Sequence, residues 1–122
     1  MYIANDRSEL ILSLIDERVN ICMVVDLGCN DGATLSGLNF SESLRGVDCH
    51  GVDYLITPSA VNNDEISFHI CDLNGDLLEI KDLLKTSDLT LLLDVLEHLH
   101  KPEQFLEKLS QIIKPGSQLV IT

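Results

Sequence analysis

Short apolar runs alternate along the chain with longer segments in which apolar residues recur every three or four positions. The runs predict five strands, at residues 21–25, 50–55, 66–71, 89–93 and 118–122. The helical spacing predicts helices at residues 7–20, 33–44 and 76–85, a short helix start at 57–60, and a helix that begins at Pro102 and stops before Pro115-Gly116. This alternation predicts an α/β fold, with a Rossmann-like, doubly wound parallel sheet and helices on both faces.

Four of the predicted strands end in an aspartate, at Asp26, Asp53, Asp72 and Asp94. In a parallel sheet the carboxyl ends of the strands meet at one edge, and folds of this kind bind ligands there. Aspartate is also common wherever a strand passes into a loop, which explains one or two of the four. Four in the same position favour a shared site at that edge.

Residues 24–32, Val-Val-Asp-Leu-Gly-Cys-Asn-Asp-Gly, predict a strand, a tight turn and the start of a helix. Gly28 and Gly32 leave room for a ligand to approach the backbone. The turn carries Asp26 and Asp31 but no Lys or Arg, whereas a phosphate site needs N–H donors and usually a cation. The turn therefore indicates a positively charged ligand rich in hydroxyl groups, and it suits the pyrophosphate of a nicotinamide cofactor poorly. Cys29 is interpreted as a small filler rather than a nucleophile.

The charge balance narrows the class of partner. The 122 residues include 20 Asp and Glu against 8 Lys and Arg, for a formal net charge of −12. This argues against nucleic acid as a partner, because phosphates need a basic surface, and solubility is the simpler interpretation of the acidity. The four cysteines form no C-x-x-C pair, so we predict reduced thiols and no metal site.

The length predicts one domain over residues 1–122. Polar residues precede the first apolar segment, unlike a secretory signal, and the longest apolar run, at 89–93, is too short to cross a bilayer. We therefore expect a cytoplasmic location and no membrane partner.

Three segments, taken in order, resemble the class I S-adenosylmethionine-dependent methyltransferases. They are residues 24–32, 51–53 and 93–116, which resemble the family's first motif, the acidic end of its second strand, and the region from its fourth strand to its fifth. The resemblance covers residues 21–122 and implies the strand order 3-2-1-4-5. Asn30 stands where many members have glycine, and Asn tolerates a left-handed backbone. The family sheet usually has seven strands, so the last two have no counterpart here.

The resemblance implies S-adenosylmethionine as the cofactor and S-adenosylhomocysteine as the product. The residues implied to lie near the methionine portion are Asp26, Gly28, Cys29, Asn30, Asp31 and Gly32. Those implied for the adenosine are Asp53 at the ribose, Tyr54 at the adenine face, and Asp72 and Leu73 at the adenine edge. Asp94 and Val95 would border the reacting sulfonium.

Two aspartates compete for the ribose. Asp53 lies 25 residues after Gly28 and Asp48 lies 20 after it, against a spacing of roughly 20 in nucleotide-binding folds. We favour Asp53 because residues 50–55 lead better into the helix start that follows, and Asp48 remains the alternative.

The implied activity is in-line methyl transfer to a small-molecule acceptor, in which the protein mainly aligns the two reactants. His98, just past the fourth predicted strand, is the candidate general base; the alternative is a structural histidine that caps the loop or pairs with Glu97. The second hypothesis is a cofactor-binding, non-catalytic module or fragment that acts with a partner. Because the fifth strand would be an exposed sheet edge, we expect a homodimer or a partner chain to cover it.

Overall fold

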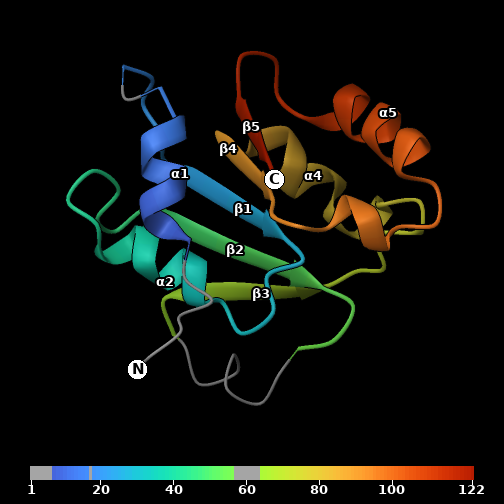
Figure 1. Ribbon diagram of the computed structural model, residues 1–122, viewed down its shortest axis with the longest axis horizontal. Helices are drawn as coiled ribbons and strands as arrows, with labels where there is room; N and C mark the ends of the chain where they lie inside the picture. The colour runs from blue at the N-terminus through green and yellow to red at the C-terminus, as the bar shows by residue number, and fades with distance from the viewer. Residues whose placement is uncertain (1–6, 17, 57–63) are drawn as a thin grey trace.

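A computed structural model describes residues 7–16, 18–56 and 64–122 (Figure 1). The helices are α1 (Ser8–Leu14), α2 (Ala33–Phe40), α4 (Lys81–Thr86) and α5 (Pro102–Ile112). The strands are β1 (Met23–Leu27), β2 (Asp48–Asp53), β3 (Ile66–Ile70), β4 (Leu89–Leu92) and β5 (Gln118–Ile121). Two 3-10 turns cover Leu78–Ile80 and Leu96–His98. The helix start predicted at residues 57–60 lies outside the described residues.

The strands form one parallel sheet in the order β3-β2-β1-β4-β5, which confirms the predicted fold and strand order. Figure 1 shows the strands pointing the same way, so that their carboxyl ends meet at one edge. Strand β1 is central because it pairs with both β2 and β4. The turn after β1 therefore lies in the middle of the edge where a ligand is expected.

Two apolar layers hold the sheet between its helices. Val24 of β1 belongs to the layer under α1 and α2, and the next residue, Val25, belongs to the layer under α4 and α5. Both valines are fully buried, as a central parallel strand covered on both faces requires. Burying one such side chain stabilises the fold by about 1.5–3 kcal/mol, so aliphatic residues suffice for a core that contains no Trp.

Several elements begin or end away from their predicted limits. The helix predicted at residues 7–20 ends at Leu14, because the side chain of Gln118 binds the backbone of Asp16 on both sides, at 2.7 Å to its N–H and 3.3 Å to its carbonyl. These bonds tie the chain after α1 to β5. The helix predicted from residue 76 starts with the 3-10 turn at Leu78, because Leu77 before it has a positive φ of 65°.

The amino edge of the sheet is closed by Asp88, which directly precedes β4. Its carboxylate accepts hydrogen bonds from the backbone N–H of Cys22 at 2.8 Å and of Met23 at 3.0 Å, and it pairs with Lys114. Burial opposes ionisation of Asp88, but these hydrogen bonds outweigh it and lower its pKa. The carboxylate therefore joins β1, β4 and the loop before β5.

Candidate functional site

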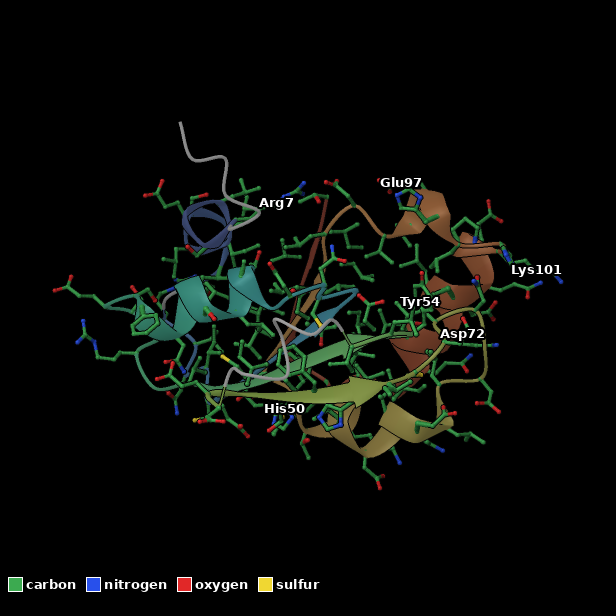
Figure 2. The ribbon with its side chains drawn as sticks, turned by 90° about the horizontal axis from the view of Figure 1, so that it is seen from below. Arg7, His50, Tyr54, Asp72, Glu97 and Lys101 are labelled. Atoms are coloured by element: carbon green, nitrogen blue, oxygen red, sulfur yellow. The ribbon has the colours of Figure 1, made fainter. Side chains whose placement is uncertain are left out.

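A pocket of about 830 Å³ opens at the carboxyl edge of the sheet. It is lined by Arg7, Asp26, Gly28, Cys29, Asn30, Asp31, Ala33, Thr34, Asp53, Tyr54, Cys71, Asp72, Leu73, Asn74, Leu93, Asp94, Val95, His98 and Leu99. Every predicted site residue except Gly32 is in this wall. Figure 2 shows Tyr54 and Asp72 beyond the ends of β2 and β3, while Arg7 and Glu97 lie on the opposite side of the sheet edge.

The turn after β1 approaches the ligand space with its backbone. Gly28 has a φ of 84°, and a Cβ there would lie 2.7 Å from Cγ2 of Val95. Asn30 also has a positive φ, of 51°, so it takes the left-handed conformation that asparagine tolerates. Gly32 serves the fold instead, because a Cβ at this residue would lie 2.9 Å from Ile66 and 3.0 Å from Phe68.

Cys29 occupies the same turn with its thiol turned into the protein. A Cβ on Gly51 would lie only 2.6 Å from its Sγ, so the thiol fills the space that this glycine leaves. Burial, followed by the charges of Asp26 and Asp53, raises the pKa of the Cys29 thiol to about 12. The thiol is therefore neutral at physiological pH, as expected of a filler.

Asp26 is the buried acid of the pocket, at 3% exposure. Burial is the main cause that raises its pKa to about 7; the charge of Asp53 adds to the increase and Arg7 opposes it. Near neutral pH this carboxyl is poised between its two forms. A cation placed beside it would favour the ionised form.

Asp53 ends β2 and holds the neighbouring turn in place. Its two carboxylate oxygens accept hydrogen bonds from the backbone N–H of Asn30 at 3.0 Å and of Tyr54 at 2.8 Å. Each oxygen keeps a further lone pair that can accept from a ligand hydroxyl. Asp48, the alternative, is the first residue of the same strand, roughly 16 Å away at a strand's rise per residue, and it is not part of the pocket wall.

Asp72 follows β3 and shapes the next part of the wall. Its carboxylate accepts a hydrogen bond from the backbone N–H of Asn74 at 2.9 Å, which closes a tight turn. The side chain of Asn74 accepts in turn from the backbone N–H of His100, also at 2.9 Å. This part of the wall is thus fixed to the loop after β4.

Asp94 follows β4 and has a positive φ of 55°. Its carboxylate pairs with the guanidinium of Arg7 and accepts a hydrogen bond from the hydroxyl of Thr122 at 3.1 Å. The bond from Arg7 is the main cause that lowers the pKa of Asp94. Among the described residues, Arg7 is the only Lys or Arg in the pocket wall.

The sequence interpretation missed Arg7, as well as the neutral wall residues Ala33, Thr34, Cys71, Asn74, Leu93 and Leu99. Nothing local marks Arg7, because its partners Asp94 and Thr122 follow it by more than eighty positions. Most of the other missed residues are sequence neighbours of predicted ones, as Asn74 is of Leu73 and Leu93 is of Asp94, so adjacency was the signal that could have found them.

His98 ends the 3-10 turn after β4 and lines the pocket. Its backbone N–H donates to the carbonyl of Val95 at 3.0 Å. Within the described ranges, its imidazole makes no ion pair with Glu97 and caps no helix end. The ring is therefore available to a ligand in the pocket.

No three His, Cys, Asp or Glu side chains in the described part of the chain are grouped so that they could hold a metal ion. No helix there is long and apolar enough to cross a membrane.

A parallel sheet in this order, with a glycine turn after its central strand and acids at its carboxyl edge, defines the Rossmann-like methyltransferase fold. The chain belongs to the methyltransferase domain family, which matches residues 6–122.

Curated relatives and solved structures agree with this assignment. The chain is 27% identical to a ubiquinone biosynthesis O-methyltransferase of Pseudomonas fluorescens over 122 residues, which cover 94% of this chain and 50% of that protein. It therefore spans about half the length of the curated relatives it matches.

Two solved structures are similar in fold. One is a chain in the complex of the Haloferax volcanii Trm112 methyltransferase activator with a putative methyltransferase, at a TM-score of 0.70 and 23% identity, covering 91% of this chain and 48% of that one. The other is human N-acetylserotonin methyltransferase in complex with SAM, at a TM-score of 0.67 and 22% identity, covering 93% of this chain and 32% of that one.

Proposed function

We propose that residues 1–122 form the cofactor-binding domain of an S-adenosylmethionine-dependent methyltransferase that acts on a small-molecule acceptor. The observation that carries this proposal is the gathering of four strand-end aspartates around one pocket of about 830 Å³. A pocket of that size suits a small-molecule cofactor, and its acidic wall suits one that carries a sulfonium and an ammonium group. The membership of the chain in the methyltransferase domain family supports the same reaction.

The chain offers a suitable group for each part of the cofactor. The buried carboxylate of Asp26 would attract the amino group, and the guanidinium of Arg7 would attract the carboxylate. The turn of Gly28, Cys29, Asn30 and Asp31 would surround the methionine portion, because Gly28 lacks the side chain that would fill this space. Asp94 and Val95 would border the sulfonium from the end of β4.

The adenosine would lie along the ends of β2 and β3. Asp53 has free lone pairs for the ribose hydroxyls. Tyr54, 66% exposed beside it, offers an aromatic face to the adenine. Asp72 and Leu73 would meet the adenine edge, where a carboxylate can accept from the exocyclic amino group.

The bound cofactor would supply an activated methyl group, so the protein would contribute mainly alignment and exclusion of water. Alignment of this kind can lower the barrier by roughly 7–11 kcal/mol. A general base is needed only when the acceptor must lose a proton, and His98 is the candidate because its imidazole lines the pocket near Asp94 and Val95. Such a base contributes about 10²–10⁴-fold.

Calorimetric titration with S-adenosylmethionine, S-adenosylhomocysteine and NAD tests the cofactor assignment. We expect the first two ligands to bind and NAD not to bind, because an acidic pocket repels a pyrophosphate. Affinity for S-adenosylmethionine should increase as the pH rises through about 7, since the ionised form of Asp26 holds its amino group. Binding of NAD with no binding of the other two would refute the proposal.

A turnover assay tests the reaction. Phenolic and other hydroxyl acceptors come first, since the curated relatives are named as O-methyltransferases. We expect His98→Ala to lower kcat by about 10²-fold or more with an acceptor that must lose a proton, and to leave the affinity for S-adenosylhomocysteine unchanged. A full rate in this variant would remove His98 from the mechanism.

The second candidate is a cofactor-binding module without turnover that acts with a partner chain. It is supported by the half-length match to the curated relatives and by the similarity to a chain from a complex with a methyltransferase activator. This candidate predicts binding of both adenosyl ligands with no methylated product from any acceptor. Restoration of product by an added partner would distinguish it from the first candidate.

A further inference from the structure

A second cavity, of about 290 Å³, lies next to the main pocket and shares Leu73 and Asn74 with it. Its other walls come from the turn before α4, from the loop before α5 with His100 and Lys101, and from α5 itself with Lys108. Figure 2 shows Lys101 at the beginning of α5, on the same side of the molecule as Asp72. We propose that this cavity binds a small organic anion, with a phosphate or carboxylate group on a compact apolar body.

The charge of this cavity is opposite to that of the whole chain. Acidic residues outnumber Lys and Arg by 20 to 8 in the sequence, so a wall of average composition would be acidic. Yet Lys101 and Lys108 lie in this wall together with the imidazole of His100, and no Asp or Glu of the described residues lines it. Neither lysine forms an ion pair with a carboxylate in the part of the chain that the structure describes. The two ammonium groups are thus available to a ligand anion.

The rest of the wall indicates an apolar body on that anion. Leu77 and Phe105 line the cavity at 1% and 5% exposure, so they belong to the core and form a firm apolar floor. A cavity of this volume lies at the lower end of the range for small-molecule sites, which suits a molecule with one ring. An apolar floor below a cationic rim favours an amphipathic anion over a bare ion.

Hydrogen bonds hold the two sides of the cavity in position. The ammonium of Lys108 donates to the carbonyl of Gly75 at 3.2 Å, and the backbone N–H of His100 donates to the side chain of Asn74 at 2.9 Å. Both bonds join the turn before α4 to the region of α5. The site is therefore largely formed before a ligand arrives, which reduces the entropic cost of binding.

This cavity shares Leu73 and Asn74 with the proposed cofactor pocket but attracts the opposite charge, so its ligand can be tested separately. Phenyl phosphate is the probe, because it combines one apolar ring with a phosphate. We would follow it by amide NMR of the ¹⁵N-labelled chain in HEPES at constant ionic strength. We expect saturable shifts of the amides at residues 73–77 and 100–108, and at least about tenfold weaker binding of benzyl alcohol, which lacks the charge.

Lysine variants decide whether the cavity is responsible. Changing both Lys101→Gln and Lys108→Gln should weaken binding of phenyl phosphate by about tenfold or more. The matched control carries Lys81→Gln and Lys85→Gln on α4, which removes the same charge from outside the cavity, and it should bind within about twofold of the parent. All four lysines are exposed, so both double variants should fold, which circular dichroism checks.

Three results would overturn the proposal. They are an absence of amide shifts in these segments, equal weakening in both double variants, and saturable shifts confined to the turn at residues 26–32. The last would mean that the probe binds in the main pocket. None of the three bears on whether the main pocket binds S-adenosylmethionine, which has its own titration.

Discussion

Aspartates lie at both edges of the same sheet, but in opposite electrostatic conditions. At the amino edge, Asp88 holds two backbone N–H groups and Lys114, and its pKa is lowered. At the carboxyl edge, Asp26 is more deeply buried, its closest charges include the like charge of Asp53, and its pKa is raised to about 7. The ionised form of Asp88 is thus stabilised by its partners, whereas the ionised form of Asp26 is destabilised by burial and by a like charge.

The difference follows from what each end of a strand presents. Unpaired N–H groups at the amino end of β1 need acceptors, and the carboxylate of Asp88 supplies them within the protein. At the carboxyl end, Gly28 and Asn30 turn the chain through positive φ angles and leave a hollow. Arg7 compensates Asp94 at this edge, but burial and the like charge of Asp53 disfavour the ionised form of Asp26, so a cationic ligand beside Asp26 would be favoured. Strand-end acids therefore indicate a site only where the protein itself does not neutralise them.

The largest effect should come from neutralising Asp26. Its folded pKa of about 7 exceeds the unfolded value of 3.8, so its contribution to stability is complete below about pH 4 and is lost as the pH rises through 7. Asp26→Asn cannot ionise, so this loss of stability at high pH should disappear. At pH 8 the cofactor-free variant should be more stable than the parent by up to ~4 kcal/mol, with little difference at pH 4. Urea unfolding across this pH range measures it.

Asp31→Asn is the matched control, because Asp31 lies in the same turn and its acceptor role toward the N–H of Ala33 survives in Asn. It should follow the parent at every pH. Parallel stability curves for the parent and Asp26→Asn would show that the two edges do not differ in the way described.

The next effect concerns Asp88 at the opposite edge. Asp88→Ala leaves the N–H groups of Cys22 and Met23 and the ammonium of Lys114 without their acceptor, and the side chain of Asp88 is only 14% exposed. Hydrogen bonds to charged groups are worth about 1.5–3 kcal/mol each, so we expect a loss of about 3 kcal/mol in unfolding free energy. Cofactor affinity of the folded variant should stay within about twofold of the parent.

Asp82→Ala, on the exposed first turn of α4, should cost under about 0.5 kcal/mol. A change of cofactor affinity in Asp88→Ala, at a temperature where the variant is folded, would contradict the division of roles between the edges.

The third effect separates the two ends of one strand. Asp53→Ala should weaken binding of S-adenosylhomocysteine by about 10–100-fold, because a charged acceptor is lost from the ribose. Asp48→Ala at the other end of β2 should leave the affinity unchanged. Calorimetry on the two variants compares them directly. A greater loss with Asp48→Ala would reverse the assignment.

Sequence reasoning predicted the fold because its signals are local and repeated. Apolar runs predict strands and a Pro-Gly pair ends a helix, and the gathering of acids at one edge then follows from a parallel sheet. The strand order was implied by the resemblance to the methyltransferase family. The limits of α1 were not predictable in this way, since its end depends on Gln118 binding Asp16, 102 residues earlier. The hydrophobic periodicity of a segment does not reveal a contact with a residue so distant in the sequence.

The same limit explains the missing residues of the site. Arg7 reaches Thr122 across 115 positions, and only the folded sheet brings them together. The second cavity was also invisible, because Asn74 and Lys101 belong to segments that the sequence shows as separate loops. What the sequence does predict is which element ends carry charge; which charges meet is a property of the packing.

The smallest effect should come from Arg7, the one Lys or Arg among the described wall residues. It tests how far the protein itself offsets the negative charge of the carboxyl edge. Arg7→Met should weaken binding of S-adenosylmethionine by about three- to tenfold at low salt. The loss should shrink as salt is added, because the guanidinium side chain is 41% exposed. Arg18→Met, which removes a surface cation paired with Asp16, should change the affinity by less than about twofold. If Arg7 serves only to hold Asp94 and Thr122, the variant will unfold at lower urea but bind the cofactor as tightly as the parent. That result would mean that the protein neutralises part of its carboxyl edge for stability, as it does at the amino edge.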